Sequence, residues 1–372
     1  MPGQCDVSVI IPAYNAASTI DTCLEALEQQ TVPGDAYEIL VVDDGSSDGT
    51  PDRVRAHPDA RLFTQERAGP AAARNLGARH ARGDLLLFTD ADCQPTRDWI
   101  EQMVAPFDDE ATAAVKGAYL SRQREIVARF VQLEYEDKYA RMARQLTIDF
   151  VDTYAAAYRR DLFVAQGGFD AAYPVASVED QEFSFRLARR GLKMCFAPRA
   201  RVYHLKHAGG LGAYCRRKFT IGYWKVLVTR RYPDKIWRDS HTPQVLKAQI
   251  LLLGLATLAL AGGLFWSPLL GASGILLLLF LLSTLPFAVK AWSKDRPVAL
   301  ISPGLLLARA LALGAGYALG LVAHLGFGRL TGTRDDLHEA TQAGGCLTPA
   351  ETPNDEELAD SILFPGKGNH GS

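Results

Sequence analysis

The chain has 372 residues, which is enough for one large domain or for two smaller domains with additional segments. Its formal net charge is −2 at pH 7, so nucleic acid is not expected to be its main partner. Six cysteines are scattered without the paired spacing of a metal site, and we expect them to be reduced thiols of a cytosolic domain. The first residues show no basic segment followed by an apolar run, so no signal peptide is expected.

Short apolar runs alternate with helix-like segments over the first 90 residues. The runs predict four strands, at residues 7–11, 37–42, 61–63 and 85–88. A helix of good helix formers is predicted at 71–82. This alternation is typical of a doubly wound α/β domain. The first strand is followed by Pro-Ala-Tyr-Asn instead of the glycine-rich turn of a NAD-binding domain, so a dinucleotide is not expected.

Two carboxylates, Asp90 and Asp92, follow directly after the fourth strand, whose four large apolar residues predict burial on both faces. Ligands of open α/β sheets bind just outside the carboxyl ends of such strands. Residues two apart in a strand point to the same side, so both carboxylates can converge on one hard cation. That cation can in turn hold a diphosphate. Taken alone, the Asp-x-Asp pattern also fits a solvated turn.

Four ordered motifs resemble those of the family 2 glycosyltransferases, which have the GT-A fold. They are Val-Ser-Val-Ile-Ile-Pro-Ala-Tyr-Asn, Val-Val-Asp-Asp-Gly-Ser-Ser-Asp-Gly-Thr, Ala-Arg-Asn and Phe-Thr-Asp-Ala-Asp. The resemblance covers about residues 7–207 and implies a Rossmann-like mixed sheet that binds a nucleotide-sugar donor, with a UDP-sugar expected. It also implies a donor-binding set and a site for Mg²⁺ or Mn²⁺. The implied donor-binding residues are Pro12, Tyr14, Asn15, Asp44, Arg74 and Asp90, and the implied metal ligands are Asp92 and Asp90.

The residue chemistry agrees with these implied roles. A divalent cation stabilises charge on a departing nucleoside diphosphate as a Lewis acid. The Asp44 carboxylate can accept a hydrogen bond from a base N–H, whereas Asp43 is expected to be structural at the strand end. Arg74 offers planar donors suited to phosphate, with a solvated helix face as the alternative.

Glu179 and Asp180 stand at the start of a predicted helix that Gly191 ends. The partial positive charge of a helix N-terminus keeps a carboxylate ionised. In the family that the chain resembles, the Asp of such a pair is the catalytic base, which implies Asp180 as the base with Glu179 second. Complementing the helix dipole is the alternative role. The Gln-x-x-Arg-Trp motif of processive relatives is absent, so we expect one sugar to be added per encounter.

His204 follows the last predicted strand of the domain and alternates with Val202, so its side chain can point at the site. The resemblance implies a position from which some relatives reach the metal or the diphosphate. A surface histidine is the alternative.

The second half of the chain predicts membrane helices. Residues 210–240 mix basic and aromatic side chains, which is typical of an amphipathic helix on anionic headgroups. Residues 245–265 and 269–289 each have the roughly 20 apolar residues that span a bilayer. A third apolar segment, 298–327, contains Arg309, which we expect to face other helices, a lipid phosphate or a kink. It also carries a G-x-x-x-G pattern at Gly316 and Gly320, consistent with close helix packing.

We therefore predict four regions. They are a GT-A domain (1–209), the basic interfacial segment (210–240), an all-α membrane domain of about three helices (241–328) and a disordered acidic tail (329–372). Basic residues flank the first two spans, which places the catalytic domain on the cytosolic side of a multi-pass protein of the inner (cytoplasmic) membrane. The third segment either spans or re-enters, which decides the side of the tail.

The sequence thus predicts an inverting, membrane-bound glycosyltransferase of cell-envelope glycan synthesis. It would move one sugar to the hydroxyl of a lipid-linked or otherwise membrane-presented acceptor. A polyprenyl-phosphate glycosyltransferase is the nearest alternative, and a non-catalytic nucleotide-sugar-binding partner of an export system is the alternative from another class. The sugar, the acceptor and the oligomeric state are left open, and the first two depend on the loops around residues 116–152.

Overall fold

A mixed eight-stranded sheet forms the N-terminal part of the protein in the computed structural model, which describes residues 6–173, 176–207, 209–236, 239–240 and 242–325. The strand order is β3-β2-β1-β4-β7-β6-β8-β5. The strands are β1 (Val7–Ala13), β2 (Tyr37–Asp43), β3 (Ala60–Thr64), β4 (Leu85–Phe88), β5 (Cys93–Pro95), β6 (Thr112–Leu120), β7 (Ala156–Arg159) and β8 (Lys193–His204).

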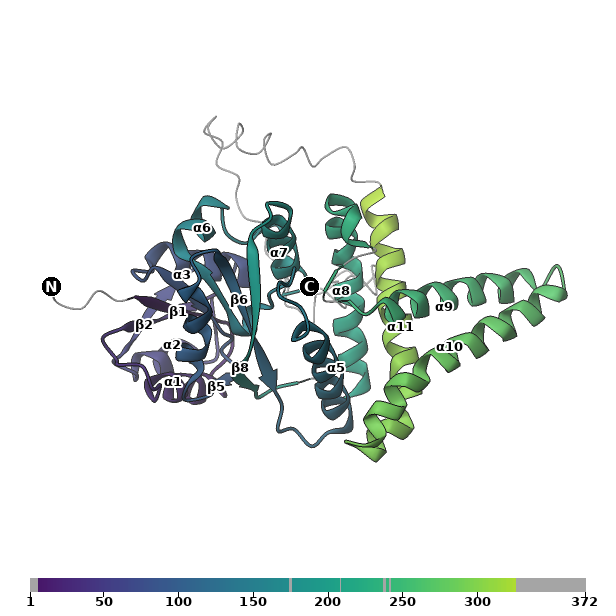
Figure 1. Cartoon of the computed structure of the whole chain (residues 1–372), viewed down its shortest axis with the longest axis horizontal. Helices are drawn as coiled ribbons and strands as arrows, with labels where there is room; N and C mark the ends of the chain where they lie inside the picture. The colour runs from purple at the N-terminus through teal and green to yellow at the C-terminus, as the bar shows by residue number, and fades with distance from the viewer. Residues whose placement is uncertain (1–5, 174–175, 208, 237–238, 241, 326–372) are drawn as a thin grey trace, which may run out of the picture.

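Helices cover this sheet and then form the C-terminal half of the chain (Figure 1). The α-helices of the sheet domain are α1 (Ile20–Glu28), α2 (Thr50–Arg55), α3 (Pro70–His80), α4 (Trp99–Val104), α5 (Ile126–Met142), α6 (Arg160–Ala165) and α7 (Glu179–Arg189). The C-terminal ones are α8 (Leu211–Arg231), α9 (Gln244–Gly262), α10 (Pro268–Trp292) and α11 (Arg296–Leu325). Short 3₁₀ helices are η1 (Ala105–Asp108), η2 (Thr153–Ala155) and η3 (Pro233–Ile236).

The first half of the sheet is parallel, as the sequence predicts. β1 lies between β2 and β4, and all four residues of β4 are buried. Apolar side chains fill both faces because this region is covered by helices on each side. The loop before β4 approaches β1 closely, since a Cβ on Gly83 would lie 2.6 Å from the carbonyl carbon of Val7. Glycine is therefore required there by packing, three residues beyond the end of α3.

The second half of the sheet contains the antiparallel pairs. β7 runs antiparallel to β4 and β6, and the short β5 pairs antiparallel with the end of β8. This last pairing sets Cys93 opposite His204, although the two residues are far apart in the sequence. The mixed GT-A sheet followed by C-terminal helices confirms the predicted fold class. Of the six cysteines, the four in the described part of the chain, Cys23, Cys93, Cys195 and Cys215, are free thiols.

Helix α8 packs along α11, and glycines make this contact possible. A Cβ on Gly316 would lie 2.1 Å from the carbonyl oxygen of Phe219, and one on Gly320 would lie 2.5 Å from that of Tyr223. Gly222 approaches the backbone of α11 equally closely. The predicted G-x-x-x-G contact is thus confirmed, with α8 as its partner. Whether α8 also lies on lipid headgroups stays a prediction.

Arg309 of α11 faces other helices, one of the three environments expected for it. It forms an ion pair with Glu134 of α5, and its Nη2 donates to Oε1 of Gln249 in α9 at 3.0 Å. Its two terminal nitrogens are therefore engaged by the sheet domain on one side and by α9 on the other, which ties the two parts of the chain together, whereas its buried Nε has no hydrogen-bond partner in the described part of the chain.

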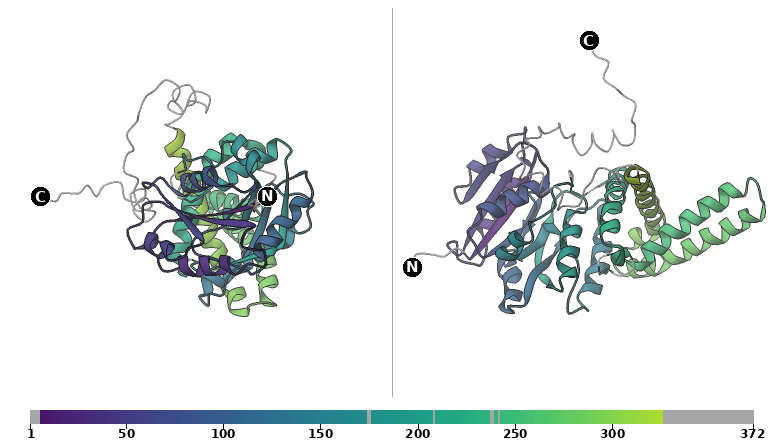
Figure 2. Two further views of the ribbon diagram at one scale, coloured as in Figure 1. Left: turned by 90° about the vertical axis from the view of Figure 1, so that its left-hand side faces the viewer. Right: turned by 90° about the horizontal axis from the view of Figure 1, so that it is seen from above.

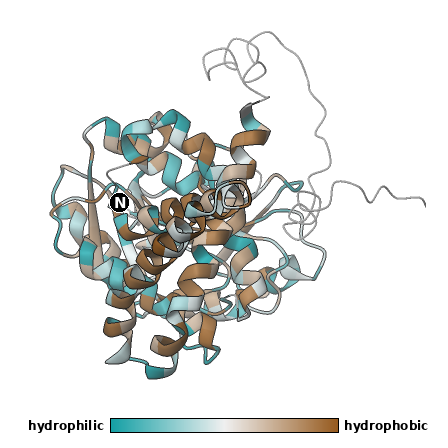
Figure 3. Ribbon diagram, turned by 90° about the vertical axis from the view of Figure 1, so that its right-hand side faces the viewer, coloured by the Kyte–Doolittle hydropathy of each residue, from teal (hydrophilic) through white to brown (hydrophobic). Residues whose placement is uncertain are grey.

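Helices α9 and α10 form a hairpin that projects away from the sheet domain (Figure 2). Hydrophobic residues dominate its surface (Figure 3), and leucines such as Leu258 and Leu264 are 70% and 83% exposed. In the described part of the chain, α9, α10 and α11 are long and apolar enough to cross a membrane, which agrees with the three predicted segments. The predicted tail, 329–372, lies outside the described residues.

Candidate active site

The predicted donor-binding residues gather where β1, β2 and β4 end. Pro12 pairs in register with Val42 of β2, and Tyr14 follows β1 with the guanidinium of Arg67 3.6 Å above its ring. Asn15 adopts a left-handed backbone conformation, with φ of 47°. Its Oδ1 accepts a hydrogen bond from the Ser47 N–H at 2.9 Å, so Asn15 braces the loop that follows β2. This loop and β1 therefore form one edge of the site.

Asp44 is buried and holds the segment that leads into α3. Its Oδ1 accepts hydrogen bonds from Gln65 Nε2 at 2.7 Å and from the Ala68 N–H at 2.8 Å, and its Oδ2 accepts one from the Gly69 N–H at 2.9 Å. By contrast, Oδ1 of Asp43 is buried and has no hydrogen-bond partner within the described ranges. Asp44 thus holds the segment before α3 in place, and its contact with a nucleobase stays a prediction.

Arg74 connects the donor side of the site to the predicted catalytic helix. It is 3% exposed, and its Nη2 donates to Asp90 Oδ1 at 2.8 Å while its Nη1 donates to Glu179 Oε1 at 3.1 Å. A solvated helix face is therefore excluded for Arg74. Through these ion pairs Arg74 of α3 fixes the end of β4 against the start of α7, although Arg74 and Glu179 are 105 residues apart in the sequence.

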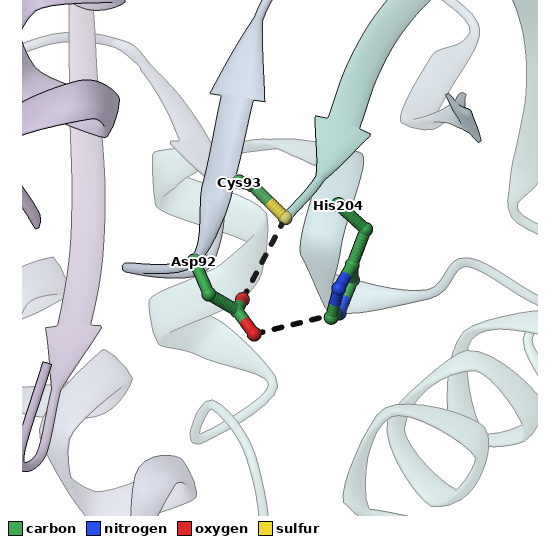
Figure 4. Close-up of side chains that lie close together, drawn as sticks. All are labelled: Asp92, Cys93 and His204. Atoms are coloured by element: carbon green, nitrogen blue, oxygen red, sulfur yellow. Dashed lines mark hydrogen bonds and ion pairs between the residues drawn. The ribbon is translucent and has the colours of Figure 1, made fainter. Parts of the chain in front are cut away.

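Asp92 and His204 lie together at the end of the sheet, with Cys93 beside them (Figure 4). His204 Nε2 is 3.7 Å from Asp92 Oδ2, too long for a hydrogen bond but compatible with two ligands of one cation bonded at about 2.1 Å each. His204 is 8% exposed, so it is not a surface histidine. The ring of His207 stacks on it, with centroids 4.6 Å apart, and holds its orientation.

Cys93 fits a packing role better than a ligand role. Burial, with Asp92 and Asp90 nearby, raises the pKa of the Cys93 thiol well above its usual range. A protonated thiol is a poor ligand, and hard cations such as Mg²⁺ prefer oxygen. The donor set that fits a divalent cation is therefore the Asp92 carboxylate with the His204 imidazole. Asp90, the other predicted ligand, has one oxygen engaged by Arg74.

Asp180 and Glu179 differ in how their oxygens are used. Both oxygens of Glu179 accept hydrogen bonds, one from Arg74 and the other from the Ser177 N–H at 2.8 Å. Asp180 is half-buried, and in the described part of the chain its carboxylate accepts one hydrogen bond, from the N–H of Gln181 at 2.7 Å. Burial and the adjacent Glu179 carboxylate raise the pKa of Asp180 to about 7. The geometry therefore ranks Asp180 ahead of Glu179 as a proton acceptor.

A cavity of about 400 Å³ connects this site to the C-terminal helices. Asp90 and Asp180 lie at one end, and side chains of α9, α10 and α11 line the other. Asp92 and His204 are not among its lining residues, so the candidate cation site lies outside this cavity.

Sequence reasoning missed the residues that α8 contributes to this cavity, namely Arg217, Lys218, Ile221 and Lys225. The sequence pattern assigns these residues only to a surface that faces the membrane. The signal was present, because positions 217, 221 and 225 recur at the spacing of one helix face.

A buried polar cluster also lines the cavity. Asp152 forms ion pairs with Lys116 and with Lys138, the latter at 3.1 Å, and it accepts a hydrogen bond from the Tyr154 hydroxyl at 3.0 Å. Burial lowers the pKa of both lysines well below its usual value. The sequence analysis linked the region between residues 116 and 152 to the choice of sugar and acceptor. This region thus contributes buried, ion-paired side chains to one side of the cavity.

The mixed GT-A sheet with carboxylates at the ends of its strands is an arrangement in which nucleotide-sugar transferases bind their donors, and comparison with known proteins connects this chain to such enzymes. Residues 8–165 match the sequence model of the family described as "Glycosyl transferase family 2". This part of the chain is therefore a family 2 glycosyltransferase domain.

Relatives with similar sequences carry glycosyltransferase names. The chain is 42% identical over 116 residues to the glycosyltransferase AglE of Haloferax volcanii, which covers 30% of this chain and 38% of AglE. It is 30% identical over 243 residues to the pre-mycofactocin glycosyltransferase of Mycobacterium tuberculosis, covering 63% of this chain and 50% of the relative. The chain thus spans half or less of the length of these relatives.

One solved structure resembles the whole arrangement. It is a mannosyltransferase from Pyrobaculum calidifontis in complex with GDP-Man and Mn²⁺, with a TM-score of 0.55 and 24% sequence identity. The match covers 85% of this chain and 86% of that protein, and it supports the fold.

Proposed function

We propose that this protein transfers one sugar from a nucleotide-sugar donor to a membrane-presented acceptor hydroxyl, with inversion at the anomeric carbon. The observation that carries the proposal is the shared cavity, which Asp90 and Asp180 line together with helices apolar enough to span a membrane. A UDP-sugar is the proposed donor, and a lipid-linked molecule is the proposed acceptor.

The donor would lie across the ends of β1, β2 and β4. Pro12, Tyr14, Asn15 and Asp44 would contact the base and ribose, and Arg74 would hold Asp90 toward the phosphates. Asp92 and His204 would hold Mg²⁺ or Mn²⁺, with Asp90 close by. Such a cation stabilises negative charge on the departing nucleoside diphosphate. The solved mannosyltransferase complex with Mn²⁺ supports a divalent cation in general.

Asp180 would act as the general base. An acceptor hydroxyl must lose its proton as it attacks, and a carboxylate with a pKa near the working pH is suited to accept it. A single displacement from the face opposite the diphosphate would invert the anomeric centre. Glu179, with both oxygens engaged, would hold Arg74 and the start of α7 in place.

The membrane setting follows from α9, α10 and α11. Basic residues before α9 and after α10 favour a cytosolic catalytic domain on the inner membrane, in a multi-pass arrangement. A catalyst fixed to the bilayer in this way meets acceptors at the membrane surface.

The direct test measures nucleoside diphosphate release from a panel of nucleotide sugars by the detergent-solubilised protein, with and without Mn²⁺. The wild-type protein is expected to release nucleoside diphosphate from one donor. EDTA is expected to abolish this release, and the Asp92→Asn variant is expected to show none. Asp52→Asn is the matched control, because Asp52 is an exposed carboxylate on α2 paired only with Arg55. Full activity in excess EDTA would exclude the cation role, and no release from any donor would contradict the proposed reaction.

A further inference from the structure

The helical side of the cavity carries three cations on one helix. Arg217, Lys218 and Lys225 all come from α8 and line the cavity that begins at the catalytic carboxylates. Lys225 lies two turns of helix beyond Lys218, so their charges are spread along the cavity from the donor side toward the membrane helices.

Other cations of the cavity are already neutralised by carboxylates. Lys138 pairs with Asp152, Lys290 lies 2.6 Å from Asp137, and Arg309 pairs with Glu134. Each of these cations thus has a carboxylate within ion-pair distance, although Asp152 also pairs with Lys116 and Asp137 also pairs with Arg141.

The α8 cations differ in this respect. Within the described ranges Arg217 makes no hydrogen bond or ion pair, although the charges of Asp92 and Asp90 act on it from a distance, and Lys225 donates only to the Thr242 hydroxyl, at 3.1 Å. Lys218 is 3.9 Å from Glu134, a carboxylate that Arg309 already occupies. Burial, together with the charge of Arg217, lowers the pKa of Lys218, and burial lowers that of Lys225. An anion beside these groups would reverse both effects.

Apolar side chains continue the cavity beyond the cations. Leu246 comes from α9, Phe287 from α10 and Leu306 and Leu313 from α11, the three helices long enough to cross a membrane. A ligand that fills the whole cavity must therefore be anionic near Asp180 and apolar toward the bilayer.

We propose that this cavity is the acceptor site and that it takes a lipid whose head group carries phosphate, held by Arg217, Lys218 and Lys225. A phosphate offers several acceptor oxygens to these donors, and the α9–α11 side chains receive the hydrocarbon chain. Its designation as the acceptor site depends on the proposed glycosyl transfer, whereas lipid-phosphate binding does not. The phosphate anchors the lipid, so that a hydroxyl beyond it can reach Asp180.

Binding is tested first, without any donor. Farnesyl phosphate, farnesol and inorganic phosphate are titrated onto the full chain in a neutral detergent, and affinity is followed by thermal shift and by fluorescence of the tryptophans. Farnesyl phosphate is expected to bind at least about tenfold more tightly than farnesol, since two or three charge-assisted contacts are lost with the phosphate. Inorganic phosphate alone is expected to bind weakly, because it cannot use the apolar half.

Variants locate the site. The double variant Lys218→Gln/Lys225→Gln is expected to lower farnesyl phosphate affinity about tenfold or more and to leave UDP affinity unchanged. Arg216→Gln is the matched control, because Arg216 is a neighbouring cation of α8 that does not line the cavity. Equal affinity for farnesol and farnesyl phosphate, or an equal loss in Arg216→Gln, would overturn the proposal.

Turnover then separates the sources of the phosphate. Labelled nucleotide sugar is supplied with farnesyl-diphosphate-linked N-acetylglucosamine or with phosphatidylinositol, both of which carry hydroxyls beyond the phosphate. Label in one lipid supports the acceptor role and identifies an isoprenoid or a glycerophospholipid source. Tight lipid-phosphate binding with nucleotide release, but without label in either lipid, would contradict the acceptor role and leave the glycosyltransferase reaction standing.

Discussion

The cavity has two walls that are built differently. On the catalytic-domain wall, charged side chains are locked by one another, as Arg74 is between Asp90 and Glu179. On the helical wall, glycine contacts bring α8 against α11, and the cations of α8 line the cavity with a carboxylate at ion-pair distance only for Lys218, in the described part of the chain, and that carboxylate also pairs with Arg309.

This difference indicates what each wall can contribute to the proposed reaction. Paired and buried charges fix the positions of groups before a substrate arrives, which suits chemistry on a donor. Weakly paired cations beside apolar side chains can instead gain stronger partners when an amphipathic anion binds. The variants described below test this difference between the two walls.

Removing the proposed base should have the largest effect. Asp180→Asn is expected to lower kcat by roughly 10²–10⁴-fold while nucleotide affinity persists, because proton removal is lost but the donor contacts are not. Transfer rates and calorimetric UDP binding measure the two quantities, and NMR of the wild-type product gives its anomeric configuration. Near-normal transfer would remove Asp180 from the mechanism, and a retained configuration would exclude single displacement.

Breaking the ion pairs of the catalytic-domain wall should destabilise the fold. Arg74→Gln leaves Asp90 and Glu179 without their cation in a buried site, which is expected to cost about 3–5 kcal/mol. Thermal and denaturant unfolding in detergent measure it. Arg61→Gln is the control, because the Arg61–Glu38 pair is partly exposed and should contribute about 1 kcal/mol or less. Equal losses of unfolding free energy in the two variants would show that the Arg74 ion pairs stabilise the fold no more than a partly exposed pair does.

The pH profile follows from the pKa of Asp180. This carboxyl is protonated below about pH 7 and cannot accept a proton there, so kcat/KM should rise with pH through about 7 and then level off. Each unit below the pKa should cost about tenfold. Rates between pH 5 and 9 at saturating Mn²⁺ measure the profile. A flat profile between pH 6 and 8 would be inconsistent with Asp180 as the base.

Enlarging a glycine of the helical wall should have the smallest effect. In Gly316→Ala the new methyl group meets the backbone of α8, and overpacking of this kind costs about 1–3 kcal/mol. Melting temperature and lipid-phosphate affinity should both fall, because α8 must move. Gly304→Ala is the control on the same helix, since a Cβ there meets nothing within 4 Å. A similar melting temperature in both variants would argue against the close α8–α11 contact.

The positions of individual strands and helices could be predicted from the sequence alone. The continuous apolar run of β4 predicted a buried strand, and in a parallel sheet the carboxylates that follow such a strand lie at the binding edge. The three long apolar helices were also readable, because length and composition alone decide whether a helix can cross a bilayer.

Partners distant in the chain were decided only by the tertiary structure. The sequence gives no sign that Arg74 joins Asp90 to Glu179, that β5–β8 pairing sets Cys93 opposite His204, or that Gly83 meets β1. The basic face of α8 likewise fits a lipid surface until α11 occupies one side of the helix and the cavity the other. Periodicity within an element shows which residues share a face, whereas what that face meets depends on how the whole chain packs.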